Sequence, residues 1–157
     1  MAREGEAAMA QKTMRLNYFS VMANLLTGGR AYAGDANSPA GFLTLTTTGR
    51  KSGQPRAAHL IYIRDGSAYV VTASNQGKPR NPGWYFNARG NPQVTLDVHG
   101  GQVRALAEIA VPEKRRELWA RLLEIAPMYG GYEKKTQREI PMIILRPIAE
   151  SAAASAG

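Results

Sequence analysis

The feature that most constrains this chain is a set of short strand-like segments, which fall into two groups joined by tight turns. Val94, Leu96 and Val98 alternate with polar residues, as expected for a half-buried strand. The Asp65–Gly66 pair supplies the positive φ that a tight hairpin requires. The predicted strands cover residues 42–48, 57–64, 68–73, 93–98, 102–110 and 141–145. Because no strand–helix–strand alternation accompanies them, the pattern favours a mainly β (α+β) fold, either a small barrel or a rolled antiparallel sheet.

Helical periodicity separates or flanks these strands. Asn81 followed by Pro82 indicates an N-cap and the first residue of a short helix. The adjacent Gly130 and Gly131 instead indicate an irregular crossing that leads to a short polar segment ending near Arg138. The predicted helices cover about residues 12–27, 82–89 and 112–126.

The length of 157 residues suits one domain with a real core and is too short for two ordinary ones. We expect a single domain over residues 12–148, including the N-terminal helix. Residues 1–11 and 149–157 are small or of low complexity, and they are predicted to be flexible tails.

Charge and composition narrow the expected partners. Lys and Arg total 20 against 12 acidic residues, a formal net charge of +8, which favours an anionic partner. No RNA-binding aromatic motif, zinc-finger spacing or basic recognition helix is present, so nucleic acid is not the expected partner. The absence of Cys and of a signal-peptide pattern fits a cytoplasmic protein. Arg3, Lys12 and Arg15 would allow the N-terminal helix a weak contact with a membrane surface.

Cations gather in the turn at residues 49–56, directly after the first strand. Arg50, Lys51 and Arg56 lie beside the hydroxyl of Ser52 in a Gly- and Pro-containing connection. Such a loop is suited to a phosphate or to several carboxylates. Binding of an anion and a merely solvated hairpin both stay open as interpretations, because a loop of this composition is typical of either. It is not a P-loop, since it lacks the required glycine spacing and a strand follows it.

No hydrolytic or metal-binding constellation is visible. His59 and His99 are the only histidines, and no carboxylate cluster accompanies them, so no metal site is predicted. Tyr129 and Tyr132 could stack on a planar ligand or bind a carbonyl oxygen, or they could form a lid over the edge of the core. Trp84 is predicted mainly as a packing residue. Together these features favour a cofactor with an anionic tail and a flat ring, which would itself carry redox chemistry.

Several motifs resemble one known family. They are Thr47–Arg56 (TTGRKSGQPR), Ala73–Gly77 (ASNQG), Asn81–Asn87 (NPGWYFN) with Asn91–Pro92, then Tyr129, Tyr132 and Ile140–Pro141. In this order, over about residues 40–147, they are similar to the deazaflavin-dependent nitroreductases, the F420-dependent oxidoreductases of actinobacteria. The resemblance implies a split β-barrel of about six mostly antiparallel strands with three to four flanking helices.

The resemblance also implies an activity and a site. Reduced coenzyme F420 would transfer a hydride to an electrophilic small molecule, such as an unsaturated lactone, a quinone or a nitro-aromatic compound. The implied catalytic residues are Tyr129, Tyr132 and Ser74, with Tyr129 or water as the proton donor. The implied cofactor-binding residues are Arg50, Lys51, Ser52, Arg56, Ala73, Ser74, Asn75, Gly77, Trp84 and Asn87; the first, second and fourth of these would hold the phosphate and glutamate tail.

Alternatives remain at this level. The chain departs from the family pattern at His59, Asn75 and Ala126, positions that would affect substrate preference or tail binding. A non-catalytic F420-binding protein and an FMN-dependent oxidoreductase on the same barrel are the competing hypotheses. The oligomeric state, monomer or homodimer, is open.

Overall fold

The computed structural model describes residues 38–148. The predictions made for the N-terminal helix, its membrane contact and the two flexible tails fall on residues 1–37 and 149–157, outside the described residues. Within the described range, no helix is both long and apolar enough to cross a membrane.

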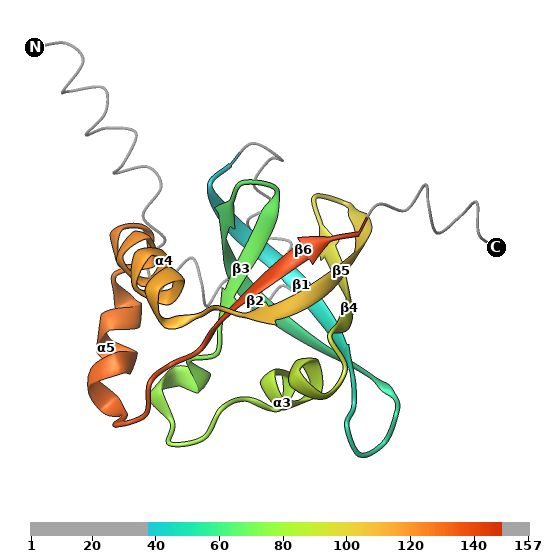
Figure 1. Ribbon diagram of the computed structural model, residues 1–157, viewed down its shortest axis with the longest axis horizontal. Helices are drawn as coiled ribbons and strands as arrows, with labels where there is room; N and C mark the ends of the chain where they lie inside the picture. The colour runs from blue at the N-terminus through green and yellow to red at the C-terminus, as the bar shows by residue number, and fades with distance from the viewer. Residues whose placement is uncertain (1–37, 149–157) are drawn as a thin grey trace, which may run out of the picture.

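Six antiparallel strands close into a barrel (Figure 1). Their order around the barrel is β1-β2-β3-β6-β5-β4, so β6 separates the two hairpin groups on one side while β1 and β4 meet on the other. The predicted six-stranded, mainly β fold is therefore confirmed. The strands are β1 (Ala40–Thr48), β2 (Pro55–Asp65), β3 (Ala68–Thr72), β4 (Gln93–Val98), β5 (Gly101–Ile109) and β6 (Met142–Pro147).

Side chains alternate between two hydrophobic cores, because successive residues of a strand point to opposite faces of the sheet. On β6, Ile143 and Leu145 belong to the core inside the barrel, whereas Met142 and Ile144 belong to the core on its outer wall. The inner core also takes Trp84, Tyr85 and Ala88 from helix α3 (Gly83–Gly90). Figure 1 shows α3 lying across the lower end of the barrel, which it therefore closes.

The outer core is covered by α4 (Pro112–Ile125) and α5 (Met128–Lys135), which lie together beside the barrel in Figure 1. Helix α5 corrects the prediction of an irregular crossing over these residues. The paired glycines do not break the helix, since Tyr129 beside them is buried in the outer core together with residues of α4 and β2. A Cβ at Gly130 would lie 3.6 Å from Leu123 Cδ2, an ordinary van der Waals distance, so the packing of α5 beside α4 does not depend on glycine there.

Two details around residues 74–82 also differ from the prediction. The polar loop contains one 3-10 turn, η1 (Asn75–Gly77). Asn81 is not an N-cap, because α3 begins at Gly83 and has no side-chain cap at its first turn. The Oδ1 of Asn81 instead accepts a hydrogen bond from Arg138, 57 residues away in the sequence.

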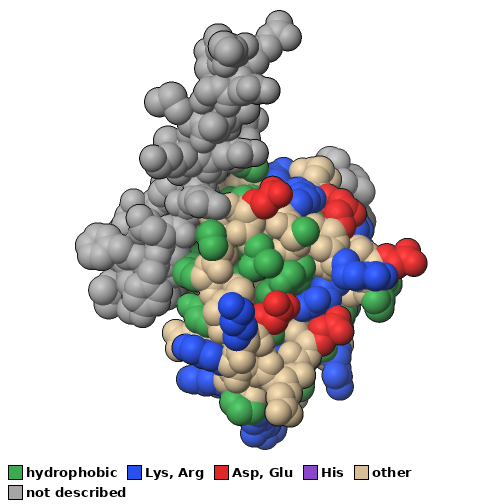
Figure 2. All heavy atoms as spheres, turned by 90° about the vertical axis from the view of Figure 1, so that its left-hand side faces the viewer, with side chains coloured by type: hydrophobic (Ala, Val, Ile, Leu, Met, Phe, Trp, Pro, Cys, Tyr) green, Lys and Arg blue, Asp and Glu red, His purple; other side chains and the backbone are tan. Residues whose placement is uncertain are grey.

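A charged cluster joins the β2–β3 hairpin to α4. Lys114 Nζ and Arg121 Nη1 each lie 3.1 Å from a carboxylate oxygen of Asp65. Burial alone would raise the pKa of Asp65, but hydrogen bonds from Lys114 and Arg121 outweigh it and hold that pKa below its ordinary value. Figure 2 shows the face formed by α4 and α5, where carboxylates lie among Lys and Arg side chains and give way to cations at its lower end.

We expect Asp65→Asn to lower the free energy of unfolding at neutral pH, because it leaves Lys114 and Arg121 without their carboxylate. The stability that comes from a lowered pKa is present above the ordinary value of 3.8 and is lost as the pH falls through the folded-state value. The deficit should therefore shrink in acid, which denaturant titrations at neutral and acidic pH would measure. Glu108→Gln, which removes the exposed partner of Arg146, is the control; a deficit of equal size there would contradict the role of Asp65.

Candidate functional site

The cationic turn is a tight loop between β1 and β2. Gly49 N donates to Gln54 O at 2.8 Å, and Gly53 N donates to Gly49 O at 2.8 Å. Gly53 has a φ of +70°, in the left-handed region that favours glycine, and a Cβ at Gly49 would lie 2.5 Å from Ser52 Oγ, so it would displace that hydroxyl. The folded-back loop leaves the side chains of Arg50 and Lys51 exposed at its tip.

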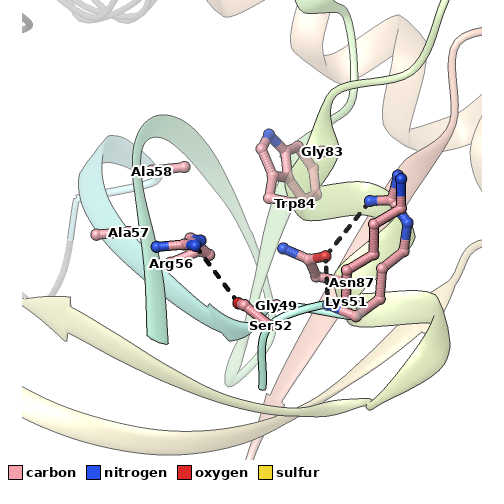
Figure 3. A pocket seen from close by; sticks show the side chains of 10 residues that line it. Gly49, Lys51, Ser52, Arg56, Ala57, Ala58, Gly83, Trp84 and Asn87 are labelled. Carbon is pink, nitrogen blue, oxygen red and sulfur yellow. Dashed lines mark hydrogen bonds between the residues drawn. The ribbon is translucent and has the colours of Figure 1, made fainter. Parts of the chain in front are cut away.

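A groove of about 420 Å³, here called the cationic groove, runs between this loop and α3. Figure 3 shows Trp84 and Asn87 facing it from α3, with Arg56, Ala57 and Ala58 of β2 on the opposite side. Among residues 38–148, no carboxylate forms an ion pair with a cation of this groove. The complete lining is Gly49, Arg50, Lys51, Ser52, Arg56, Ala57, Ala58, Gly83, Trp84 and Asn87.

Asn87 fixes the loop to the helix. Its side chain is 7% exposed, and its Nδ2 donates to Thr47 Oγ1 at 3.2 Å. Its Oδ1 accepts from the Arg50 backbone N at 3.1 Å and from Arg50 Nη1 at 3.5 Å. Because the Arg50 guanidinium also lies 5.0 Å from the centre of the Phe86 ring, one cation of the groove is held in place before any ligand arrives.

Ser52 organises the opposite side of the groove. Its Oγ accepts hydrogen bonds from Gln54 N at 3.2 Å and from Arg56 Nη2 at 3.4 Å (Figure 3). A guanidinium has five N–H donors, and the hydrogen bond to Ser52 uses one of them, so Arg56 keeps donors for a ligand. The groove therefore presents fixed cationic donors from both of its walls.

A second cavity of about 250 Å³, here called the aromatic pocket, adjoins the groove. Trp84 lines both cavities, so the two share one wall residue. The rings of Tyr129 and Tyr132 are 5.5 Å apart at 85°, an edge-to-face pair on α5. The lining is Phe42, His59, Leu60, Ile61, Thr72, Ser74, Asn75, Gln76, Pro82, Trp84, Met128, Tyr129 and Tyr132.

Two polar groups of the pocket have defined surroundings. Burial raises the pKa of the Tyr129 hydroxyl above its ordinary range, with the neighbouring Tyr132 contributing, so this hydroxyl keeps its proton at neutral pH. His59 Nδ1 lies 2.8 Å from Thr44 Oγ1, a hydrogen bond across the β1–β2 pair. Both residues line the pocket, whose walls mix apolar and polar side chains.

The structure brings together most of the predicted site residues. Two do not line either cavity: Ala73 is fully buried, and Gly77 packs against α5. Trp84 is both a core residue, as predicted, and a wall of both cavities. In the cationic groove lie Arg50, Lys51, Ser52, Arg56, Trp84 and Asn87, and in the aromatic pocket lie Ser74, Asn75, Trp84, Tyr129 and Tyr132.

His59 lines the pocket, although its place in the sequence marks it only as a departure from the family pattern. The signal was strand alternation, because His59 lies two positions before Ile61, which packs in the outer core beneath α5. His99, by contrast, is exposed and is bound through Nε2 to Tyr62 Oη at 3.0 Å, away from both cavities. No group of three or more metal-ligating side chains occurs in the part of the chain that the structure describes.

A closed antiparallel barrel with a cationic groove beside an aromatic pocket is the arrangement expected of a split β-barrel for an anionic, ring-containing cofactor. The family model for F420H(2)-dependent quinone reductase matches residues 17–147, and the chain belongs to that family. The predicted class, an F420-dependent oxidoreductase of actinobacterial type with coenzyme F420 as its cofactor, is thereby confirmed.

Individual relatives agree with this assignment. An F420H(2)-dependent quinone reductase of Mycobacterium tuberculosis is 41% identical over 108 residues, which are 66% of this chain and 71% of the relative. A solved F420-H2 dependent reductase superposes with a TM-score of 0.62 at 34% identity and covers 67% of this chain and 93% of its own. A structure described as a domain-swapped dimer gives the same TM-score and identity, over 79% of its own chain.

Gly77 has a structural reason to be glycine. Its φ is +79°, and a Cβ there would lie 2.9 Å from Lys135 Cβ and 3.0 Å from Tyr132 O. The second of these atoms belongs to the backbone of α5, so it cannot move aside without moving the helix that carries both pocket tyrosines. Gly77 therefore sets how closely η1 packs against α5.

Gly77→Ala should destabilise the protein by about 1–3 kcal/mol, because strained backbone and overpacking add. Thermal unfolding measures this loss. The matched control is Gly131→Ala on α5, where a Cβ meets nothing within 4 Å and φ is not positive; it should be neutral or stabilising by up to about 1 kcal/mol. Equal effects of the two substitutions would contradict the close approach at Gly77.

Proposed function

We propose that this chain transfers a hydride from reduced F420 to a quinone, and that the cavities described above form its active site. The observation that carries the proposal is the meeting of the two cavities at Trp84, because one ligand with an anionic tail and a flat ring can then occupy both. Membership of the F420H(2)-dependent quinone reductase family supports the choice of cofactor and of substrate class.

The cationic groove fits the tail of F420, which carries a phosphate and glutamate carboxylates. Arg50, Lys51 and Arg56 would hold these anions, and Ser52 and Asn87 would keep two of the cations in place. Charge-assisted hydrogen bonds are the strongest class of polar contact available to a protein. The absence of a competing carboxylate partner for these cations, within residues 38–148, supports binding of an external anion.

The aromatic pocket fits the ring end of the cofactor and a flat substrate. When bound, reduced F420 supplies a hydride, that is, two electrons and one proton, to the electrophile. Trp84 and Ser74 would orient the ring where the cavities meet, and the apolar walls of the pocket would exclude water. Asn75 would contact the ring or its linker, whereas Ala73 and Gly77 would act through the shape of the backbone.

Tyr129 is suited to bind the substrate carbonyl oxygen as a hydrogen-bond donor. Its hydroxyl is protonated at neutral pH already at the ordinary pKa of 10.0, and burial raises that pKa further, so it would act as a hydrogen-bond donor to negative charge that develops on that oxygen. The proton that completes the hydroquinone would come from Tyr129 or from water. Tyr132, edge-on to Tyr129, would hold that ring in position.

The central experiment titrates the purified protein with F420 and then follows oxidation of F420H2 by quinones, unsaturated lactones and nitro-aromatic compounds. We expect saturable binding and fastest oxidation by quinones. No binding on the order of tens of micromolar would contradict the proposal. Bound F420H2 that every electrophile leaves unoxidised would favour a non-catalytic binding protein, and flavin absorbance of the purified protein would favour FMN.

Arg50→Ala and Lys51→Ala should each weaken F420 binding by about 1–3 kcal/mol, because each removes a charge-assisted contact to the tail. The loss should decrease at high salt, where exposed charges are screened. Fluorescence titration of the bound deazaflavin measures both effects. Arg146→Ala, which removes an exposed cation paired with Glu108 on β5, is the control and should leave the affinity unchanged. Unchanged affinity in the Arg50 and Lys51 variants would refute their role.

Tyr129→Phe should lower kcat for quinone reduction by about 10²-fold, because it removes one donor to the developing oxyanion. The affinity for F420 should stay the same. Tyr85→Phe is the control, since Tyr85 is equally buried in the barrel and lines neither cavity of the site. Turnover by Tyr129→Phe that equals turnover by the control would assign proton delivery to water.

A further inference from the structure

The rim of the aromatic pocket contains a run of unusual backbone. Asn75, Gln76 and Gly77 have successive φ values of 47°, 57° and 79°. Two of these three residues are not glycine, although left-handed backbone disfavours residues with a Cβ. Such conformations persist where the surrounding structure holds them, and they gather at functional sites. Asn75 and Gln76 line the pocket, so the turn forms part of its wall.

Arg138, on the segment between α5 and β6, holds both ends of this turn. Its Nη2 donates to Ser74 O at 2.9 Å and its Nη1 to Ala73 O at 3.2 Å, just before the turn. Its Nε donates to Lys78 O at 3.1 Å, just after it. A further bond, from Nη1 to Asn81 Oδ1 at 2.5 Å, reaches the start of α3. One guanidinium therefore brackets the whole segment from Ala73 to Asn81.

These acceptors are all uncharged, and among residues 38–148 no carboxylate pairs with Arg138. Burial lowers the pKa of its guanidinium from the ordinary value. The planar fork of five N–H donors can satisfy several carbonyls at once, which a lysine cannot do in the same geometry. The positive charge that remains lies directly behind Ser74, at the wall of a site for an anionic cofactor.

We propose that Arg138 is a positioning residue that fixes the left-handed turn at residues 75–77 in the shape that binds the deazaflavin cofactor. The identity of that ligand rests on the function proposed above, whereas the clamp on the turn does not. Without the clamp, the strained turn would open for part of the time. Because only the closed form binds, the apparent Kd would rise as the closed fraction falls.

Amide hydrogen exchange in the cofactor-free protein tests the clamp. Two amides report on the turn: Gly77 N donates to Ser74 O at 2.9 Å, and Lys78 N donates to Asn75 O at 3.1 Å. In Arg138→Gln we expect these amides to exchange at least about tenfold faster, since charge-assisted bonds are lost. The amide of Ala107, bonded to Pro92 O at 2.8 Å on the other side of the barrel, should be unaffected.

Two further variants make the test specific. Arg138→Lys keeps the positive charge but loses the planar set of five N–H donors. We expect the Gly77 and Lys78 amides to exchange at a rate between those of the wild type and Arg138→Gln. Arg121→Gln is the matched control, because Arg121 likewise binds a backbone carbonyl, that of Arg64, and a side chain, that of Asp65, but at the β2–β3 hairpin. If Arg138→Gln does not fold, as judged by thermal unfolding, the lysine variant still decides the question.

The second measurement is the Kd for F420, by fluorescence titration of the same variants. We expect a rise of about tenfold in Arg138→Gln and a smaller rise in Arg138→Lys, with kcat at saturating F420H2 retained. Arg121→Gln should bind as the wild type does. Unchanged exchange at Gly77 and Lys78 in both Arg138 variants would overturn the clamp. Faster exchange with unchanged F420 affinity would overturn its role in binding.

The two measurements separate this inference from the proposed function. If the wild type does not bind F420, the proposed function fails while the exchange data still decide whether Arg138 holds the turn. If the wild type binds F420 and exchange is unaffected by either substitution, the proposed function stands and the positioning role of Arg138 is refuted.

Discussion

The packing of α3 into the end of the barrel is the contact on which the site depends. Trp84 and Tyr85 fill that end with apolar surface, at 8% exposure each, and this burial fixes the helix. From the same helix, Asn87 reaches the cationic loop and Trp84 forms the wall shared by both cavities. A short helix thereby joins the stability of the core to the geometry of the binding site.

The two cavities of the site differ in their electrostatics, since one presents exposed cations and the other a buried neutral hydroxyl. In the cationic groove, exposed cations without carboxylate partners among the described residues remain hydrated, so an anionic tail can replace water at little cost. In the aromatic pocket, the Tyr129 hydroxyl is buried, which raises its pKa and strengthens any hydrogen bond that it donates. A ligand that spans both regions gains affinity from the first and orientation from the second.

The strands could be predicted well because alternation and hairpin turns are local signals. The 68–73 strand and its Asp65–Gly66 turn, for example, agree with β3 to within one residue. Helix α5 could not be predicted, because two glycines weaken a helix locally, whereas the burial of Tyr129 against strands distant in the sequence favours it. Asn81 likewise carries a capping signal, which the hydrogen bond from Arg138 overrides. Both errors arise where contacts distant in sequence outweigh local preference.

The sequence by itself determined the barrel class, the cationic turn and the motifs that place the chain in its family, because each depends on residues close together in the chain. Only the tertiary structure decided that the groove and the pocket meet at Trp84, that His59 faces the pocket tyrosines, and that Arg138 holds the turn at residues 75–77. These arrangements bring together residues far apart in the chain, such as Phe42 and Tyr132 of the pocket, which are 90 positions apart and meet only because the chain folds.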